Sequence, residues 1–358
     1  MRFFRRFFVS ALPYPISRLL KICRKWYLDH LEDRIIFPIW IAFQCIRNKK
    51  RVVILRRINA LGDVLCTLPM VEDIKQRHPH CELVFVTARP YRKMVLLSET
   101  VSFVYGASSW TFAPFPVFGL IEKIYSPQTT DERDPLAGAK CHLVDDLAGS
   151  CGLNVSNKQS RLFAPRSLIE ASLSTYGLLS EFSHGRRLLA ISCGRTWPVR
   201  MWDAYKWQQL VDLIHKDFDV TILQFGFTLG PDVEDEFDKI SGVVPLVNRL
   251  KTEELIGLLA SCSLVVSIDS GPVHIAGALG VPLVGLFGAV NPQYRMPKSS
   301  PAAGVISNVP CLFCHNTTPL GHWKNGCPHN MRCMKELDVQ SVFTAVRDML
   351  SVTASKVS

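Results

Sequence analysis

The sequence predicts an α/β protein with two doubly wound domains that face each other across a cleft. Three observations predict this class. Short apolar runs alternate with helical patterns from residue 51 onward, which is typical of β-α-β units and parallel sheets. Two such series are separated by residues 166–187. The 358 residues, 48% of them hydrophobic and 20% charged, are enough for two domains with sizeable cores.

The first series is expected to form a domain over residues 51–183. Val52–Leu55 predicts a buried strand, followed by a turn and a helical stretch to about residue 78. Leu83–Thr87 and His142–Asp145 predict further strands. Residues 97–134 are rich in aromatic residues, proline and serine, so we expect loops there that contact an acceptor.

The second series is expected to form a domain over residues 184–335. It predicts a helix at Ala204–Lys216 and strands at Leu188–Ser192, Val220–Phe225, Leu264–Ser267 and Pro282–Phe287. A last helix at about Asp338–Leu350 follows in residues 336–358, and we expect it to cross back onto the first domain.

The N-terminal residues 1–50 form a basic amphipathic extension. Residues 1–51 hold 12 of the 41 Lys and Arg but only 3 of the 31 Asp and Glu, so the rest of the chain is nearly neutral, with 29 basic and 28 acidic residues. The cations alternate with aromatic residues such as Phe3, Trp26 and Phe43, which favours contact with an anionic bilayer surface. A nucleic-acid partner is disfavoured, because its binding face would need clustered cations in the body of the protein.

This extension is not expected to span a membrane. Its longest uncharged run, Ile35–Ile46, has 12 residues and contains Pro38, whereas a spanning helix needs about 20 apolar residues. Basic residues from Arg18 to Lys25 also interrupt the apolar stretch that a secretory signal requires. The alternative to peripheral membrane contact is an extra helical layer packed on the body of the protein.

An acidic residue follows the first predicted strand. The run from Val52 to Val64 has the form of a strand, a loop and a helix start, with Gly62 allowing a tight turn and Asp63 in the first helical turn. Open parallel sheets bind ligands beyond the carboxyl ends of their strands, where this loop lies. The position therefore favours a ligand site, although an N-cap or a surface turn would explain the same residues.

A second motif, from Leu264 to Pro282, predicts a strand, a polar turn and a short helix. Pro272 suits the first helical position and Gly280 suits the helix end. The helix would begin at Ser270 and Gly271 with free N–H groups at the positive end of its dipole, an arrangement that binds phosphate. The alternative is an ordinary capped helix that binds nothing.

Both motifs resemble those of glycosyltransferase family 9, the family of the lipopolysaccharide heptosyltransferases. Residues 54–69 are similar to its opening signature, and residues 269–282, which begin Asp-Ser-Gly-Pro-x-His, are similar to its donor motif. The resemblance covers about residues 51–350. It implies a fold of the GT-B type, in which two Rossmann-like domains face each other across a cleft.

The resemblance also implies roles for individual residues. Asp63 would be the general base, because a sugar hydroxyl becomes a competent nucleophile only as its proton leaves. Ser270 and Gly271 would hold the donor diphosphate. Asp269 would contact the donor sugar and His274 would line the site, although a buried histidine bonded to a carbonyl is the alternative for His274.

A third segment, from Ser192 to Trp202, resembles the family segment in which small residues precede a lysine. Arg200 stands in place of that lysine and keeps its positive charge, and a surface cation beside a packed tryptophan is the alternative. Ser192 is the donor-binding candidate among the small residues. Glu234 belongs to an acidic run that would meet the nucleotide ribose, and a solvated helix N-terminus explains that run as well.

The implied reaction is an inverting transfer with Asp63 and Arg200 as catalytic residues. The family precedent is ADP-heptose as donor and the lipid A–core of lipopolysaccharide as acceptor, with no metal or further cofactor. We therefore expect a cytoplasmic enzyme, peripheral on the inner membrane. Another donor or acceptor sugar, or a non-catalytic sugar-nucleotide-binding or scaffold protein at the membrane, remains the alternative.

Four of the twelve cysteines cluster near the C-terminus with the spacing Cys311-x2-Cys314-x12-Cys327-x5-Cys333. Four soft ligands in a short segment suit a structural zinc ion. Reduced structural cysteines and disulfides are the alternatives, and the scattered placement of the other eight favours a reducing compartment.

Overall fold

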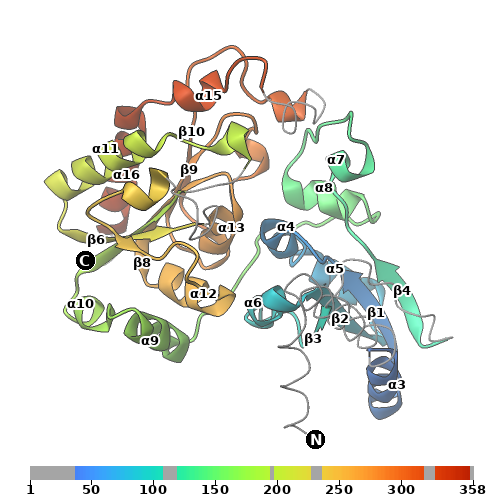
Figure 1. The fold of residues 1–358 in the computed structure, drawn as a ribbon. Helices are drawn as coiled ribbons and strands as arrows, with labels where there is room; N and C mark the ends of the chain where they lie inside the picture. Colours follow the sequence, from blue (N-terminus) through green and yellow to red (C-terminus); the bar gives the residue numbers. More distant parts are fainter. Residues whose placement is uncertain (1–36, 108–118, 194–196, 227–235, 318–326, 355–358) are drawn as a thin grey trace, which may run out of the picture.

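The protein has two parallel sheets with helices on their faces, one sheet in each domain (Figure 1). The structure, a computed structural model, describes residues 37–107, 119–193, 197–226, 236–317 and 327–354. The α/β class with two doubly wound domains is therefore confirmed.

The first sheet has four strands in the order β3-β2-β1-β4. Its central strand β1 has four successive buried residues, Val52 to Leu55, as expected for a parallel strand that is covered on both faces. The strands are β1 (Arg51–Arg56), β2 (Cys81–Ala88), β3 (Phe103–Ala107) and β4 (Ile121–Tyr125). The helices of this domain are α3 (Phe37–Asn48), α4 (Leu61–Cys66), α5 (Met70–Arg77), α6 (Arg92–Leu96), α7 (Thr130–Arg133) and α8 (Leu143–Gly149), with η2 (Arg89–Tyr91).

The second sheet has six strands in the order β10-β9-β8-β5-β6-β7. On α11 the residues Trp207, Leu210, Val211 and Ile214 recur at helical spacing and are buried against it. The strands are β5 (Arg187–Ser192), β6 (Val220–Phe225), β7 (Val244–Pro245), β8 (Cys262–Ile268), β9 (Leu283–Leu286) and β10 (Ala302–Val305). The helices are α9 (Arg166–Thr175), α10 (Leu179–Ser183), α11 (Ala204–Asp217), α12 (Thr252–Ala260), α13 (Gly271–Ala278), α15 (Arg332–Lys335) and α16 (Val339–Ala354), with η3 (Pro198–Arg200), η4 (Glu236–Lys239), η5 (Pro292–Tyr294) and η6 (Cys314–Asn316).

The strand predicted at His142–Asp145 is wrong, because these residues begin helix α8. His142 is its N-cap and accepts a hydrogen bond from the backbone N–H of Val144 through Nδ1, at 3.3 Å. Asp145 and Asp146 occupy the first turn, where carboxylates interact favourably with the helix dipole. The N-cap and the two carboxylates favour a helix start, and they outweigh the preference of the short apolar run for a strand.

The last helix does not cross back onto the first domain. Helix α16 packs against α11 and strands β8, β9 and β10 of the second domain. Val342, Val346 and Leu350 are buried there in one core with Trp207. This core covers the apolar face that the helix would otherwise expose.

The domain boundary expected at residue 183 also lies earlier. Helix α9 packs on α12 of the second domain, so closely that a Cβ on Gly257 would lie 2.2 Å from Oγ of Ser172. Residues 166–183 therefore belong structurally with the second domain.

The sequence predicts that the N-terminal extension contacts a membrane, with an extra helical layer on the body of the protein as the alternative. Residues 37–48 form such a layer. Phe37, Ile41 and Cys45 of α3 are buried against Val52 and Ile54 of β1. Residues 1–36 lie outside the described residues. In the part of the chain that the structure describes, no helix is long and apolar enough to cross a bilayer.

Candidate active site

Two adjoining pockets lie where the domains meet, one of about 500 Å³ and one of about 300 Å³. Both are lined by Ala60 and Gly62 of the first domain and by Ser270 and Gly271 of the second. These residues follow the central strands β1 and β8, so the pockets lie at the carboxyl ends of both sheets. Parallel sheets bind their ligands at this edge.

Asp63 lines the smaller pocket from the first turn of α4. The N-cap of this helix is Ala60, so Asp63 is not a capping residue. Its Oδ2 accepts a hydrogen bond from Nη2 of Arg57. No partner for Oδ1 is found among the described residues, which leaves one carboxylate oxygen available to a ligand.

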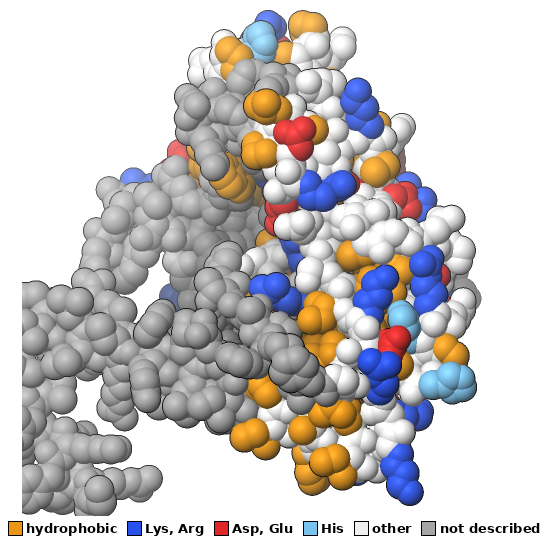
Figure 2. Space-filling view, turned by 90° about the vertical axis from the view of Figure 1, so that its right-hand side faces the viewer, with side chains coloured by type: hydrophobic (Ala, Val, Ile, Leu, Met, Phe, Trp, Pro, Cys, Tyr) orange, Lys and Arg blue, Asp and Glu red, His pale blue; other side chains and the backbone are white. Residues whose placement is uncertain are grey.

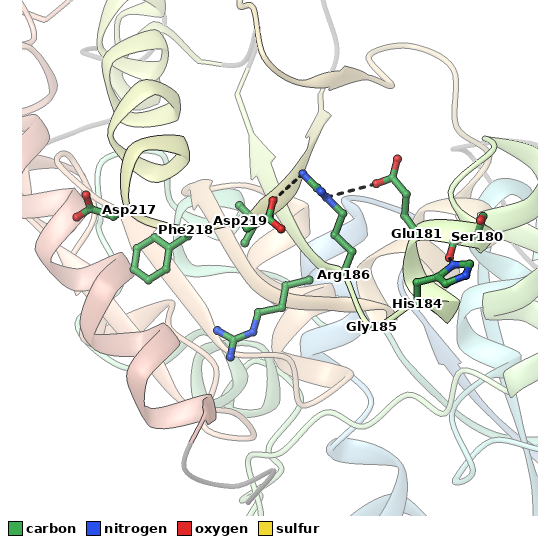
Figure 3. Close-up of a pocket in the computed structure, with 10 residues that line it drawn as sticks. Ser180, Glu181, His184, Gly185, Arg186, Asp217, Phe218 and Asp219 are labelled. Atoms are coloured by element: carbon green, nitrogen blue, oxygen red, sulfur yellow. Dashed lines mark hydrogen bonds and ion pairs between the residues drawn. The ribbon is translucent and has the colours of Figure 1, made fainter.

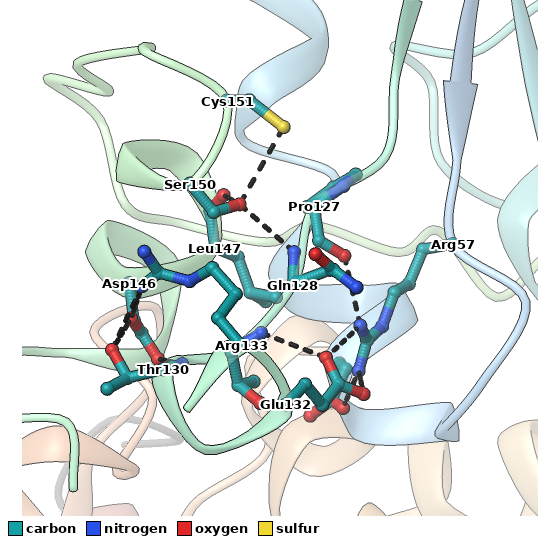
Figure 4. A network of polar contacts seen from close by, with 12 residues as sticks. Arg57, Pro127, Gln128, Thr130, Glu132, Arg133, Asp146, Leu147, Ser150 and Cys151 are labelled. Carbon is teal, nitrogen blue, oxygen red and sulfur yellow. Dashed lines mark hydrogen bonds and ion pairs between the residues drawn. The ribbon is translucent and has the colours of Figure 1, made fainter. Parts of the chain in front are cut away.

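Arg57 joins Asp63 to Glu132, and Figure 4 shows its contact with Glu132. Its Nη1 donates to Oε2 of Glu132 at 2.6 Å and to the carbonyl of Pro127 at 3.0 Å, and its Nη2 donates to Oε1 of Glu132 at 2.9 Å. Burial alone would lower the pKa of Arg57, but the hydrogen bonds to Glu132 and the charge of Asp63 outweigh burial and raise it. The guanidinium is therefore a permanent cation that fixes the orientation of Asp63.

The segment that carries Glu132 is itself held in place. Glu132 and Thr129 form the capping box of α7, in which Oε2 of Glu132 accepts the backbone N–H of Thr129 at 2.9 Å. Asp146 of α8 accepts the backbone N–H and the hydroxyl of Thr130 at 2.8 and 2.6 Å (Figure 4). The neighbouring Asp131 lines the smaller pocket. This wall of the pocket is consequently acidic and rigidly built.

The opposite wall contains the start of helix α13. Ser270 is its N-cap with extended backbone, and Pro272 is its second residue, one position later than the sequence predicts. The first N–H groups of a helix have no partner within it, and they carry the positive end of the helix dipole. Ser270 and Gly271 therefore present an anion-binding edge to both pockets.

Arg200 and Asp269 form an ion pair beside this helix start. Nε of Arg200 lies 3.4 Å from Oδ2 of Asp269, and its Nη1 donates to the backbone carbonyl of Asp269 at 3.0 Å. Burial would raise the pKa of Asp269, but the charges of Arg200 and Arg295 outweigh burial and lower it. Burial lowers the pKa of Arg200, although an arginine stays protonated in proteins. Both groups are therefore charged.

Two histidines of this wall, His274 and His315, are neutral near physiological pH. Burial lowers the pKa of each from 6.5 to about 4, and the charge of Arg295 acts in the same direction. Nδ1 of His274 lies 3.5 Å from Sγ of Cys66, a contact between the two domains. His274 is thus a buried, neutral side chain at the domain interface that also lines the smaller pocket.

The larger pocket has an apolar lining suited to a flat ring. Leu246, Leu250 and Leu255 meet Phe225 and Ile268 there. Its polar lining includes Ser192, Asn248, Lys251 and Thr252. A mainly apolar slot with a few polar groups is typical of small-molecule and cofactor sites.

The structure brings together most of the residues that the sequence predicts. Asp63, Arg200, Asp269 and His274 line the smaller pocket, Ser192 lines the larger one, and Ser270 and Gly271 lie between them. Glu234 lies outside the described residues. The sequence prediction missed Arg57, Asp131, Glu132, Arg295 and His315. Arg57 lies within the first motif but was given no role there, whereas the other four lie outside the two motifs and reach the site through long-range packing.

The four C-terminal cysteines are free thiols. No group of three or more His, Cys, Asp or Glu within the described residues, which include all four, is arranged to hold a metal ion. Cys333 is buried against Gly288, where an added Cβ would lie 2.7 Å from its Sγ. Burial and the neighbouring thiols raise the pKa of Cys333 to about 11. A structural zinc ion at these cysteines stays a prediction of the sequence.

A third depression, of about 670 Å³, lies outside the interdomain site (Figure 3). It is lined by the segment from Ser180 to Arg187 and by residues 217–220, at the amino ends of β5 and β6. Arg186 is paired there with Asp219 at 2.9 Å and with Glu181 at 3.8 Å. This depression lies at the edge of the sheet opposite the two interdomain pockets.

Comparison with known proteins relates this chain to one family of enzymes. Residues 147–324 match the model of "Glycosyltransferase family 9 (heptosyltransferase)". Lipooligosaccharide heptosyltransferase 2 of Haemophilus influenzae is 32% identical over 112 residues, 29% of this chain and 32% of that protein. The Campylobacter jejuni lipooligosaccharide heptosyltransferase 2 is 23% identical over 178 residues, 47% of this chain and 52% of its own length. The chain thus spans between a third and a half of these relatives.

Solved structures share the fold. The ADP-heptose LPS heptosyltransferase II of Escherichia coli superposes with a TM-score of 0.58 at 14% identity, over 84% of this chain and 99% of that one. The dodecameric iron-containing heptosyltransferase TibC, in complex with ADP-D-beta-D-heptose, gives 0.64 at 15% identity, over 85% and 77%. The two-domain arrangement is therefore that of the GT-B heptosyltransferases. With the family match, it shows that this chain belongs to glycosyltransferase family 9.

Proposed function

We propose that the protein transfers a heptose, or a related sugar, from a nucleoside diphosphate sugar to a lipopolysaccharide core with inversion at the anomeric carbon. One observation carries the proposal: Asp63 and the start of α13 lie on opposite walls of one pocket of about 300 Å³. A carboxylate that accepts a proton thereby faces a site that binds a departing diphosphate.

The two pockets suggest how the donor lies. The nucleoside occupies the larger, apolar pocket, and the sugar occupies the smaller one. The diphosphate then lies at Ser270 and Gly271, which line both. ADP-heptose is the first donor to test, because it is the ligand of a solved structure with this fold.

The residues present account for the proton, the bonds and the leaving charge of the transfer. Oδ1 of Asp63 takes the proton of the acceptor hydroxyl as the hydroxyl oxygen bonds to the anomeric carbon. The bond between that carbon and the diphosphate breaks on the opposite side, and its electron pair leaves with the phosphate. The helix start at Ser270 and Gly271, together with Arg200, stabilises the negative charge that gathers there. Asp269 would hydrogen-bond the sugar hydroxyls. We propose that no metal ion or further cofactor is required.

We also propose that the protein works at the cytoplasmic face of the inner membrane, where its acceptor would be presented. Helix α3 supports this proposal. Its outer face carries Ile39, Phe43 and Ile46, which are 64, 58 and 75% exposed and follow one another at helical spacing. Exposed Arg47 and Lys49 follow directly. In Figure 2, hydrophobic side chains gather at the lower end of the molecule, where α3 lies in Figure 1, with Lys and Arg beside them. Apolar residues next to cations suit an anionic bilayer.

The decisive experiment compares the wild type with Asp63→Asn. The protein is incubated with ADP-heptose and heptose-deficient lipopolysaccharide, and then with a panel of other nucleotide sugars. We expect transfer by the wild type, an inverted anomeric configuration in the product, and a loss of turnover by about 10²- to 10⁴-fold in the variant with donor binding retained. Transfer from another nucleotide sugar would replace heptose as the proposed donor sugar. A wild type that binds no nucleotide sugar would overturn the proposal in favour of a scaffold.

A further inference from the structure

Arg295 is a cation of the smaller pocket that forms no direct ion pair with another described residue. It follows η5, on the loop between β9 and β10, and lines the pocket together with Asp269, His274 and His315. Among the described residues, its guanidinium has no hydrogen bond and no ion pair. It is half-buried, and no direct ion pair within the described residues offsets the cost of partly removing its charge from water.

The other cations of the site differ in this respect. Arg57 is paired with Asp63 and Glu132, and Arg200 is paired with Asp269. The charge of Arg200 is therefore largely balanced before a ligand arrives. A diphosphate carries at least two negative charges and requires a cation that is still available.

The position of Arg295 indicates which part of the donor it meets. Ser270 and Gly271 line both pockets, whereas Arg295 lines the smaller but not the larger one, on the sugar side of the helix start. A group placed there is beyond the nucleoside and the first phosphate. It lies near the phosphate that is bonded to the sugar.

We propose that Arg295 binds the sugar-bonded phosphate of the donor and is the principal cation that stabilises the leaving diphosphate. This inference rests on the proposed function, and it adds a residue that no motif of the sequence contains. The guanidinium donates two parallel hydrogen bonds to phosphate oxygens, and these strengthen as the bond to the anomeric carbon breaks.

The test measures binding of adenosine, AMP and ADP by calorimetry to the wild type, Arg295→Ala and Arg295→Lys. The corresponding uridine and guanosine nucleosides, monophosphates and diphosphates are measured in the same way. In the series that the wild type prefers, Arg295→Ala should weaken binding of the diphosphate by about 10- to 100-fold. It should leave the nucleoside and monophosphate unchanged, and Arg295→Lys should recover part of the loss. Because the Arg295 side chain has no hydrogen bond or ion pair with any residue that the structure describes, the melting temperature should not fall.

Lys298→Ala is the matched control, since Lys298 is an exposed cation of the same loop and does not line the smaller pocket. It should bind the diphosphate like the wild type. An Arg295→Ala variant that binds the diphosphate normally would overturn the inference, and so would one that only raises the KM for the acceptor. A wild type that binds no nucleoside diphosphate of any base would instead contradict the proposed function.

Discussion

Gly62 of the first domain lies directly against His274 of the second, so that a Cβ on Gly62 would be 2.6 Å from Cδ2 of the imidazole. Gly62 has no positive φ. The expectation that it permits a tight turn is therefore wrong, and its small size instead lets α4 approach α13. Gly271 has the reciprocal position, where a Cβ would lie 3.0 Å from Cδ2 of Leu61. The distance between the acid and the helix start depends on these two glycines.

Gly62→Ala should separate the two walls of the pocket. A displacement of about 1 Å from productive geometry can cost on the order of 10²-fold in rate, so we expect a loss of kcat of that size with a folded protein. Steady-state kinetics and circular dichroism check this. Gly149→Ala is the control, because a Cβ at Gly149 has open space around it and its backbone needs no glycine. Equal activity of the two variants would show that the close approach is unimportant.

Arg57→Met should place Asp63 and Glu132 near each other without their shared cation. Like charges repel, so the Asp63 carboxylate should no longer be held in one position. We expect a fall in kcat of about 10²-fold, because the base loses its fixed orientation. Arg133→Met is the control: it removes a cation of α7, the helix that carries Glu132, which contacts Asp146 instead, and it should keep the wild-type kcat. A wild-type kcat in Arg57→Met would refute the role of Arg57.

Stability should fall in mild acid because of His274 and His315. Each has a folded pKa of about 4 against 6.5 in a model compound, so the unfolded chain binds protons first as the pH falls. Their contribution is complete above pH 6.5 and is lost as the pH falls from 6.5 toward 4, by on the order of 3 kcal/mol for each residue. Urea unfolding across this range measures it. His315→Gln should be less sensitive to pH than the wild type, and an unchanged dependence would contradict the burial argument.

The outer face of α3 should bind anionic vesicles. Phe43→Asp combined with Ile46→Asp should weaken binding to phosphatidylglycerol vesicles by at least about tenfold. Each change removes apolar area that would enter the bilayer and adds a negative charge that the anionic lipids repel. Sedimentation with vesicles of graded anionic content checks this. Phe182→Asp is the control, because Phe182 is an exposed aromatic of the second domain. Loss of binding in the control alone would place the membrane surface elsewhere.

Transfer should continue after removal of divalent ions. The cationic groups at the leaving diphosphate are Arg200, Arg295 and the helix start, all supplied by the chain. We therefore expect kcat in excess EDTA within about twofold of its value in magnesium, a difference of less than 1 kcal/mol in barrier. Activity that disappears with EDTA and returns with magnesium would show that a metal ion shares this role.

The sequence was sufficient for the elements whose signals are local. Apolar runs such as Val52–Leu55 and Leu264–Ser267 identify central strands, because a strand buried on both faces must be apolar throughout. Pro272 and Gly280 mark the ends of α13, because each suits only a few backbone conformations. The order of these elements predicted two parallel sheets, and the two motifs predicted the pocket between them.

Only the tertiary structure decided what these local signals leave open. The apolar face of α16 could have covered either domain, and the core around Trp207 and Val342 settled which one. Glu132 and Arg295 contribute to the site from positions without a motif, because partners far apart in sequence meet only after folding. The role of Gly62 also depends on a residue that is far away in the sequence. A glycine in sequence specifies that a side chain is absent, and His274 in the folded protein shows why that space is needed.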